Sequence, residues 1–129
     1  VAMTRASGTS TITDAQRLRI KESDRLATVC DFLTILGTDI RQTKDGLIID
    51  ENNDSTDPSG PAAHCPAPSL CGGTVSSHND HRIAMAAAVA SCRADGPVII
   101  TGAEAVKKSY PDFFTDFTKL GGKIEILEY

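Results

Sequence analysis

The chain has 129 residues, of which 40% are hydrophobic and only 5% aromatic. This length and composition suit a single globular domain over residues 1–129, with an aliphatic, alanine-filled core. The formal charge of −4 and the pI near 5.2 argue against general binding to nucleic acid or to a membrane surface. No segment approaches the about 20 apolar residues of a membrane span, and no signal peptide is recognised, so we expect a soluble, cytoplasmic protein.

The first third of the chain predicts extended structure, a helix and a hairpin. Residues 9–20 are β-branched and partly alternating, which favours a strand. A helix capped by Ser23 or a neighbour should follow, because apolar residues recur at three- and four-residue steps until Gly37. Residues 39–42 and 47–49 then predict the two strands of a hairpin with Asp-Gly in its turn.

Residues 50–77 predict a long surface loop. They are rich in Asn, Asp, Ser, Pro and Gly, and four prolines exclude a long helix or a central strand. Loops of this length are usually functional or mobile, and residues 70–75 leave room for a short strand at the loop's end. The loop need not divide the chain into two domains.

The last third predicts two helices and two strands. A helix over about 80–93 presents a small-residue face, and residues 98–100 form a short apolar strand. A third helix begins near Pro111, and residues 123–127 alternate as a last strand. The buried side of that third helix is expected to be Phe113, Phe114, Phe117 and Leu120. The order of elements predicts an α/β (α+β) layer with helices on one side of a mixed sheet.

The four cysteines are expected to be free thiols. Two of them fall within helical patterns, where a buried thiol behaves as a small hydrophobic group. A metal site is the alternative, but no pair has the short spacing that structural zinc favours, so we predict no metal. The residues considered for such a site are His64, Cys65, Cys71 and His78.

Two segments place an arginine at the start of a predicted helix: residues 23–27 (Ser-Asp-Arg-Leu-Ala) and 78–86 (His-Asn-Asp-His-Arg-Ile-Ala-Met-Ala). A helix start exposes unpaired N–H groups and the positive end of the helix dipole, which suits anions. Arg25 and Arg82 can each grip carboxylate or phosphate at two points, and Lys108 can add a point charge. The sequence therefore indicates a site for a small molecule with several negative charges. The alternative is that each arginine simply pairs with a nearby Asp at the surface.

Residues beside these arginines are further candidates. Glu22, next to Lys21, is a candidate proton carrier if partial burial raises its pKa, or else a carboxylate that complements the helix dipole. His81 could hold a substrate or transfer a proton, or could pack as a neutral group. Asp24 and Asp80 are either helix caps or groups that orient the arginines.

Three segments resemble, in the same order, signature segments of the 5-enolpyruvylshikimate-3-phosphate synthase family. They are residues 19–25 (Arg-Ile-Lys-Glu-Ser-Asp-Arg), residues 78–86, and residues 108–114 (Lys-Ser-Tyr-Pro-Asp-Phe-Phe). The resemblance covers nearly the whole chain except residues 50–77. It implies part of an inside-out, barrel-like α/β lobe built from βαβαββ repeats. It also implies transfer of the enolpyruvyl group of phosphoenolpyruvate to the 5-hydroxyl of shikimate 3-phosphate, with release of phosphate, on the route to chorismate and aromatic amino acids. No cofactor or metal is implied.

The resemblance also implies roles for individual residues. Phosphoenolpyruvate would be bound by Arg25, Arg82 and Lys108. Lys21 would contact shikimate 3-phosphate and the reacting centre, and Glu22 would be the candidate proton donor. The supporting residues that line the same site would be Asp80 and His81.

The family enzyme is about three times longer than this chain, which resembles only its C-terminal third. The resemblance therefore places the N-terminal lobe and a catalytic Asp upstream of Val1, and we expect the isolated chain to be inactive. Two alternatives stay open. The acceptor could be a UDP-amino sugar, as in UDP-N-acetylglucosamine enolpyruvyl transferase, or the chain could be a non-catalytic anion-binding domain.

Overall fold

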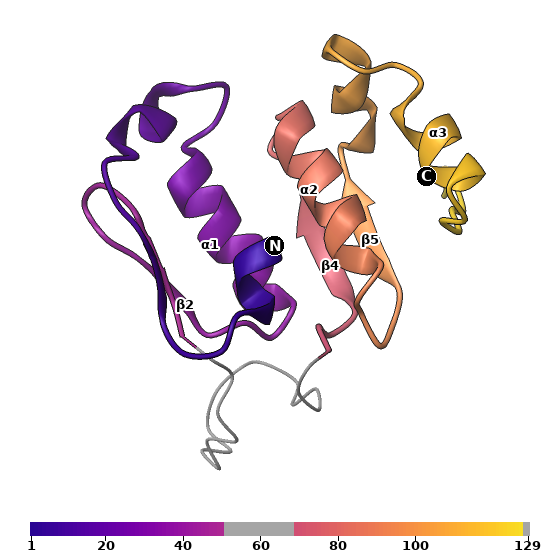
Figure 1. Ribbon diagram of the computed structural model, residues 1–129. Coiled ribbons are helices and arrows are strands. Elements are labelled where there is room, and N and C mark those ends of the chain that lie inside the picture. The colour runs from indigo at the N-terminus through magenta and orange to yellow at the C-terminus, as the bar shows by residue number, and fades with distance from the viewer. Residues whose placement is uncertain (51–68, 128–129) are drawn as a thin grey trace.

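The computed structural model describes residues 1–50 and 69–127, whose strands lie in two separate sheets (Figure 1). The first sheet is antiparallel and has the strand order β1-β3-β2, where β1 is Ser10–Ile12, β2 is Ile40–Gln42 and β3 is Leu47–Ile49. The predicted hairpin of β2 and β3 is confirmed. β1 joins it on the far side of β3.

Gly46 occupies the hairpin turn because only a residue without a side chain fits there. The Thr43 N–H donates to the Gly46 carbonyl across the turn at 2.9 Å. A Cβ atom on Gly46 would lie 1.8 Å from the carbonyl oxygen of Ile12, at the end of β1. The close approach of β1 to the turn thus depends on this glycine.

The second sheet contains β4 (Gly73–Ser76) and β5 (Val98–Thr101), which are parallel and place Val75 opposite Ile100. Helix α2 (His81–Ser91) connects these two strands, as parallel pairing requires. The predicted α/β class is confirmed, although the strands form one antiparallel and one parallel sheet instead of a single mixed sheet.

The core lies where α1 (Arg25–Ile35) and α2 meet the strands, and Figure 1 shows these two helices side by side. The small residues of α2 allow close packing, since Ala84, Ala87 and Ala90 are fully buried. The larger buried side chains of this core come mainly from α1, the residue after it, and β3: Leu26, Phe32, Leu33, Leu36, Leu47 and Ile49.

The predicted strand over residues 9–20 is only partly correct. β1 covers Ser10–Ile12, and Gln16–Ile20 forms the 3-10 helix η2. The Ala15 N–H donates to the Asp45 carbonyl at 2.7 Å, and the Leu18 N–H donates to the Ala15 carbonyl at 2.9 Å. These bonds turn the chain after β1, which an alternating pattern alone does not reveal. A further 3-10 helix, η1, spans Ala2–Arg5.

The predicted third helix exists as α3 (Phe113–Lys119), after the 3-10 helix η3 (Ala103–Lys108). Its predicted buried side is wrong, because α3 has no buried residue and the Leu120 side chain is 89% exposed. The Phe113 ring instead contacts the rings of Tyr110, Phe114 and Phe117. The aromatic residues therefore pack on one another and not into the core.

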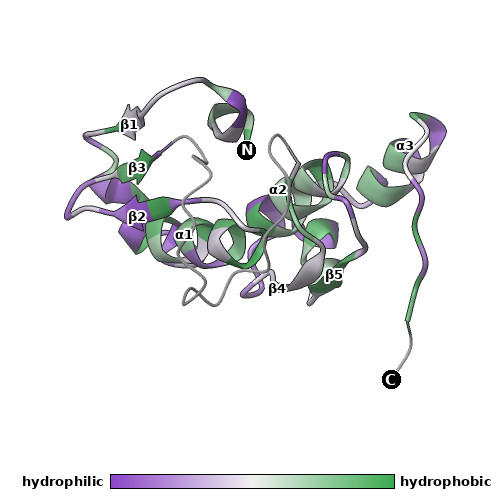
Figure 2. Ribbon diagram, turned by 90° about the horizontal axis from the view of Figure 1, so that it is seen from below, coloured by the Kyte–Doolittle hydropathy of each residue, from purple (hydrophilic) through white to green (hydrophobic). Residues whose placement is uncertain are grey.

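The predicted last strand over residues 123–127 is also wrong, since none of these residues is in a strand. Figure 2 shows an extended segment that leads away from α3. Alternation produces a strand only where a neighbouring strand accepts and donates its hydrogen bonds, and Ile126 stays 83% exposed.

The predicted loop over residues 50–77 ends earlier than expected, and residues 51–68 lie outside the described part of the chain. Leu70 bridges to Ala94, and β4 follows at Gly73–Ser76, close to the short strand expected there. No described helix is long and apolar enough to cross a membrane.

The expectation of four free thiols is confirmed for Cys30 and Cys92 and wrong for Cys71, which is disulfide-bonded. Cys71 is buried outside the helices, just before β4, where the argument from helical patterns does not apply. Cys65 lies outside the described residues. Within residues 1–50 and 69–127, no group of three or more potential metal-binding side chains is present.

Candidate anion-binding site

Both predicted arginines lie at helix starts. Arg25 is the first residue of α1, and Arg82 is the second residue of α2. The Asp24 carboxylate accepts hydrogen bonds from the backbone N–H groups of Leu26 at 3.2 Å and Ala27 at 3.1 Å. The Asp80 carboxylate accepts from the Arg82 N–H at 3.0 Å. Asp24 and Asp80 are therefore the helix caps.

The two helix starts meet at Asp80, whose side chain is 0% exposed. Its Oδ2 accepts from Arg25 Nε at 2.7 Å and from Ser23 Oγ at 2.9 Å, and its Oδ1 accepts from Arg25 Nη2 at 3.2 Å. Burial raises the pKa of Asp80, but the hydrogen bonds from Arg25, Ser23 and Arg82 outweigh it and lower the pKa overall. One ionised carboxylate thus ties the start of α1 to the start of α2.

Arg25 has a second carboxylate partner. Its Nη2 also donates to Glu22 Oε2 at 2.5 Å, and its side chain is only 11% exposed. The hydrogen bond to Asp80 raises the pKa of Arg25. Arg25 thus does pair with an Asp, as the alternative to anion binding predicted, but this Asp lies at the start of the other helix.

Glu22 is exposed, and its pKa is lowered, first by a hydrogen bond from its own backbone N–H and then by the charge of Arg25. Loss of solvent contact and the charge of Asp80 raise the pKa of Glu22, but the lowering influences outweigh them. The raised pKa on which its role as a proton carrier depends is therefore not present in this conformation. Lys21 is exposed beside it, directly after η2. His81 is half-buried, and its Nδ1 is buried without a hydrogen-bond partner among the described residues.

Lys108, the last residue of η3, reaches the start of α2. Its Nζ donates to the Asn79 carbonyl at 2.6 Å. His78 and Asn79 both have left-handed backbones, with φ of 50° and 59°, which is uncommon outside glycine. Their backbone N–H groups donate to the hydroxyls of Ser76 and Ser77, each at 3.1 Å. The tight turn before α2 is therefore held by both side-chain hydroxyls and the Lys108 ammonium.

Arg82 differs from Arg25 in its surroundings. Within the described part of the chain, its guanidinium makes no hydrogen bond or ion pair, and the residue is exposed. Arg82 and the two remaining donors of Lys108 thus offer free positive charge at the place where the helix starts meet.

Arg19 was not singled out by the sequence. Its Nη1 forms an ion pair with Asp24 at 2.9 Å, and its Nε and Nη2 donate to the carbonyls of Lys44 at 3.0 Å and Thr43 at 2.5 Å. It therefore connects the hairpin turn to the cap of α1. The only feature of the sequence that could have drawn attention to Arg19 is its place in the segment 19–25. Nothing in that segment indicates that Arg19 contacts the hairpin.

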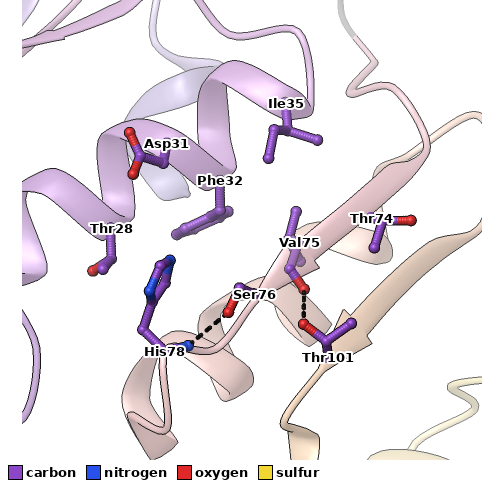
Figure 3. Close-up of a pocket in the computed structure, with 9 residues that line it drawn as sticks. All are labelled: Thr28, Asp31, Phe32, Ile35, Thr74, Val75, Ser76, His78 and Thr101. Carbon is purple, nitrogen blue, oxygen red and sulfur yellow. Dashed lines mark hydrogen bonds between the residues drawn. The ribbon is translucent and has the colours of Figure 1, made fainter.

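A cavity of about 410 Å³ lies between α1 and the second sheet (Figure 3). Phe32 and Ile35 of α1 face Val75 of β4 across it, and the His78 ring lies near Phe32. Of the residues that the sequence singled out, only His78, considered for a metal site, lines this cavity, and none of those predicted to bind the anion does. The candidate site is the surface at the helix starts and not this cavity.

These features define an α/β domain with two helix starts that each carry an arginine and an Asp cap and that are joined at Asp80. The family model for EPSP synthase (3-phosphoshikimate 1-carboxyvinyltransferase) matches residues 1–117, and the chain belongs to this family.

Relatives and solved structures agree with this assignment. The 3-phosphoshikimate 1-carboxyvinyltransferase of Clostridium novyi is 48% identical over 118 residues, which are 92% of this chain and 24% of the relative. That of Clostridioides difficile is 46% identical over 119 residues, with the same coverage. A structure of EPSP synthase from Acinetobacter baumannii superposes with a TM-score of 0.82 and 39% identity, covering 98% of this chain and 27% of that one. The chain spans about a quarter of the length of these proteins, less than the third predicted.

Proposed function

We propose that this chain supplies the phosphoenolpyruvate-binding wall of an enolpyruvyl transferase active site. The complete enzyme would transfer the enolpyruvyl group of phosphoenolpyruvate to the 5-hydroxyl of shikimate 3-phosphate and release phosphate. The observation that carries this proposal is the junction at Asp80, which brings Arg25 and the start of α2 together, with Lys108 bonded to the turn before α2. Membership of the family supports it.

The charges suit the ligand. Phosphoenolpyruvate carries a carboxylate and a phosphate, and the site offers two guanidinium groups and one ammonium group around a helix start. Cations held in place before the ligand arrives stabilise developing negative charge without reorganisation. Asp80 would position Arg25, and His81 would line the site beside Arg82.

Lys21 and Glu22 have the reacting roles in this proposal. Lys21, exposed and without a hydrogen-bond partner among the described residues, would contact shikimate 3-phosphate. Glu22 would donate the proton to the methylene carbon, which requires a higher pKa than its present surroundings give. The chemistry uses no cofactor or metal. Since the chain spans about a quarter of its relatives, we propose that it has no transferase activity by itself.

Binding can be tested on the isolated chain with backbone ¹⁵N labels. Phosphoenolpyruvate should shift the amide signals of Arg25, His81 and Arg82. Arg82→Ala should weaken binding about ten- to a hundredfold, because a charge-assisted hydrogen bond contributes about 1.5–3 kcal/mol. Arg93→Ala is the matched control, since Arg93 is exposed just beyond the opposite end of α2. A folded chain whose signals stay still at high ligand concentration would contradict the proposal.

Activity can be tested in a chimera in which this chain replaces the aligned quarter of the Clostridium novyi relative. Phosphate release should require shikimate 3-phosphate and should not occur with UDP-N-acetylglucosamine. Activity with the UDP-sugar alone would favour the other transferase. A folded chimera that binds phosphoenolpyruvate but turns over neither acceptor would favour a non-catalytic anion-binding domain.

A further inference from the structure

Arg25 is held between two carboxylates that differ greatly in exposure to solvent. Asp80 is 0% exposed and also accepts from Ser23 and from the backbone of Arg82, so its release would break the junction of the two helix starts. The Glu22 side chain is 46% exposed, and its one side-chain partner among the described residues is Arg25. Only Glu22 can leave without disturbing the fold.

We propose that Glu22 is an internal competitor, which pairs with Arg25 and is displaced by the carboxylate or phosphate of phosphoenolpyruvate. This inference rests on the function proposed above and specifies how Arg25 becomes available. The exchange replaces one anion on the guanidinium with another.

The charge balance at Arg25 explains why displacement favours binding. One positive charge faces two negative charges there, so the group of Arg25, Asp80 and Glu22 carries a net charge of −1. With Arg82 and Lys108 included, the five charges sum to +1, so Glu22 weakens the attraction for an approaching anion and competes with it for Arg25. When Glu22 moves away, Arg25 and Asp80 balance, and the charges of Arg82 and Lys108 leave a net charge of +2 facing the ligand.

Displacement also changes Glu22 itself. The charge of Arg25 is one of the influences that lower the pKa of Glu22, after the hydrogen bond from its backbone N–H. A Glu22 separated from Arg25 loses that influence and holds a proton more readily. Arrival of the ligand would thus prepare the carboxyl group for its proposed role as a proton donor.

The test compares phosphoenolpyruvate binding by the wild-type chain, Glu22→Gln, Glu22→Ala and Glu125→Gln at low ionic strength, using amide signals of the ¹⁵N-labelled chain. Both Glu22 variants should bind about two- to fivefold more tightly, as expected when one partly exposed charge is removed near the ligand. Glu125→Gln makes the same change in net charge on the exposed segment after α3, and should leave the affinity unchanged. In the wild-type chain, the Glu22 side-chain carboxyl ¹³C signal should move on ligand addition.

Each outcome bears on the inference. If Arg82→Ala weakens binding but the Glu22 variants bind like the wild type, the proposed site stands and the inference is overturned. If Glu22 and Glu125 variants gain affinity equally, the effect is one of net charge and the inference also fails. If no variant binds phosphoenolpyruvate, both the proposed function and the inference are wrong.

Discussion

Asp24 and Asp80 cap their helices in the same manner but differ in their surroundings. The Asp24 side chain is 39% exposed and pairs with the partly exposed Arg19. Asp80 is buried and carries the ion pair with Arg25 in addition to its capping bond. Comparing the two residues therefore distinguishes the stability that a helix cap contributes from the stability that a buried ion pair contributes.

Replacement of Asp80 by Ala should lower the free energy of unfolding by about 3–5 kcal/mol, because it leaves Arg25 largely buried without its main partner. Replacement of Asp24 by Ala should cost only about 1 kcal/mol, the usual value for a lost cap. Urea denaturation of the two variants and the wild type measures both changes. Equal losses would show that burial of Asp80 adds nothing to its capping role.

For individual residues, the sequence predicted which charged side chains lie at helix starts, but not which of them pair with one another. Arg25 and Arg82 lie at helix starts because capping residues and apolar periodicity are local signals. The bond between Arg25 and Asp80 joins residues 55 positions apart, and no local pattern encodes that distance in space. The same limit hid the contacts of Arg19 with the hairpin turn.

Among the elements, η2, the hairpin turn and the start of α1 are connected by Arg19. Replacement of Arg19 by Ala should lower the free energy of unfolding by about 1–2 kcal/mol, because it removes hydrogen bonds from a charged donor. It should also shift the amide signals of Lys21 and Glu22, which lie between η2 and α1. Both effects can be followed by urea denaturation and by NMR.

Arg17→Ala is the matched control, because Arg17 lies on the same 3-10 helix but is exposed and has no hydrogen-bond partner among the described residues. Its stability should stay within about 0.5 kcal/mol of the wild type. If Arg17→Ala and Arg19→Ala lose stability equally, the connection through Arg19 is not what holds these elements together.

The elements were predicted best where local signals suffice. The helices of residues 25–35 and 81–91 and the hairpin follow from capping, periodicity and the Asp-Gly turn. The errors concern segments whose structure depends on a partner. Residues 123–127 alternate but have no strand beside them in the described part of the chain, and Leu120 has no core surface to cover.

At the scale of the whole molecule, several carboxyl groups make stability depend on acidity. The pKa of each of the following is lowered in the folded chain: Glu22, Asp24, Asp50, Asp80 and Asp116. A carboxyl group whose pKa is lowered in the folded state stabilises the fold when the pH lies above the group's ordinary pKa, which is 3.8 for Asp. This contribution is lost as the pH falls through the folded-state pKa.

The free energy of unfolding should therefore fall below about pH 4, as these carboxyl groups become protonated. Urea denaturation at pH 6 and pH 3 measures the loss. Asp80→Asn should show a smaller loss over the same range than the wild type, even though it begins from a lower stability. An unchanged loss in that variant would mean that Asp80 does not contribute to the acid sensitivity.

The junction at Asp80 has a thermodynamic consequence. Arg25 belongs to α1, which packs against β2 of the first sheet and β4 of the second, whereas Arg82 belongs to the helix that connects the strands of the second sheet. An anion held by both arginines would act as a removable cross-link between the starts of α1 and α2. At a free concentration ten times its dissociation constant, such a ligand would add about 1.4 kcal/mol to the resistance of the entire chain to unfolding. Occupancy of the site could then be followed from the melting temperature alone.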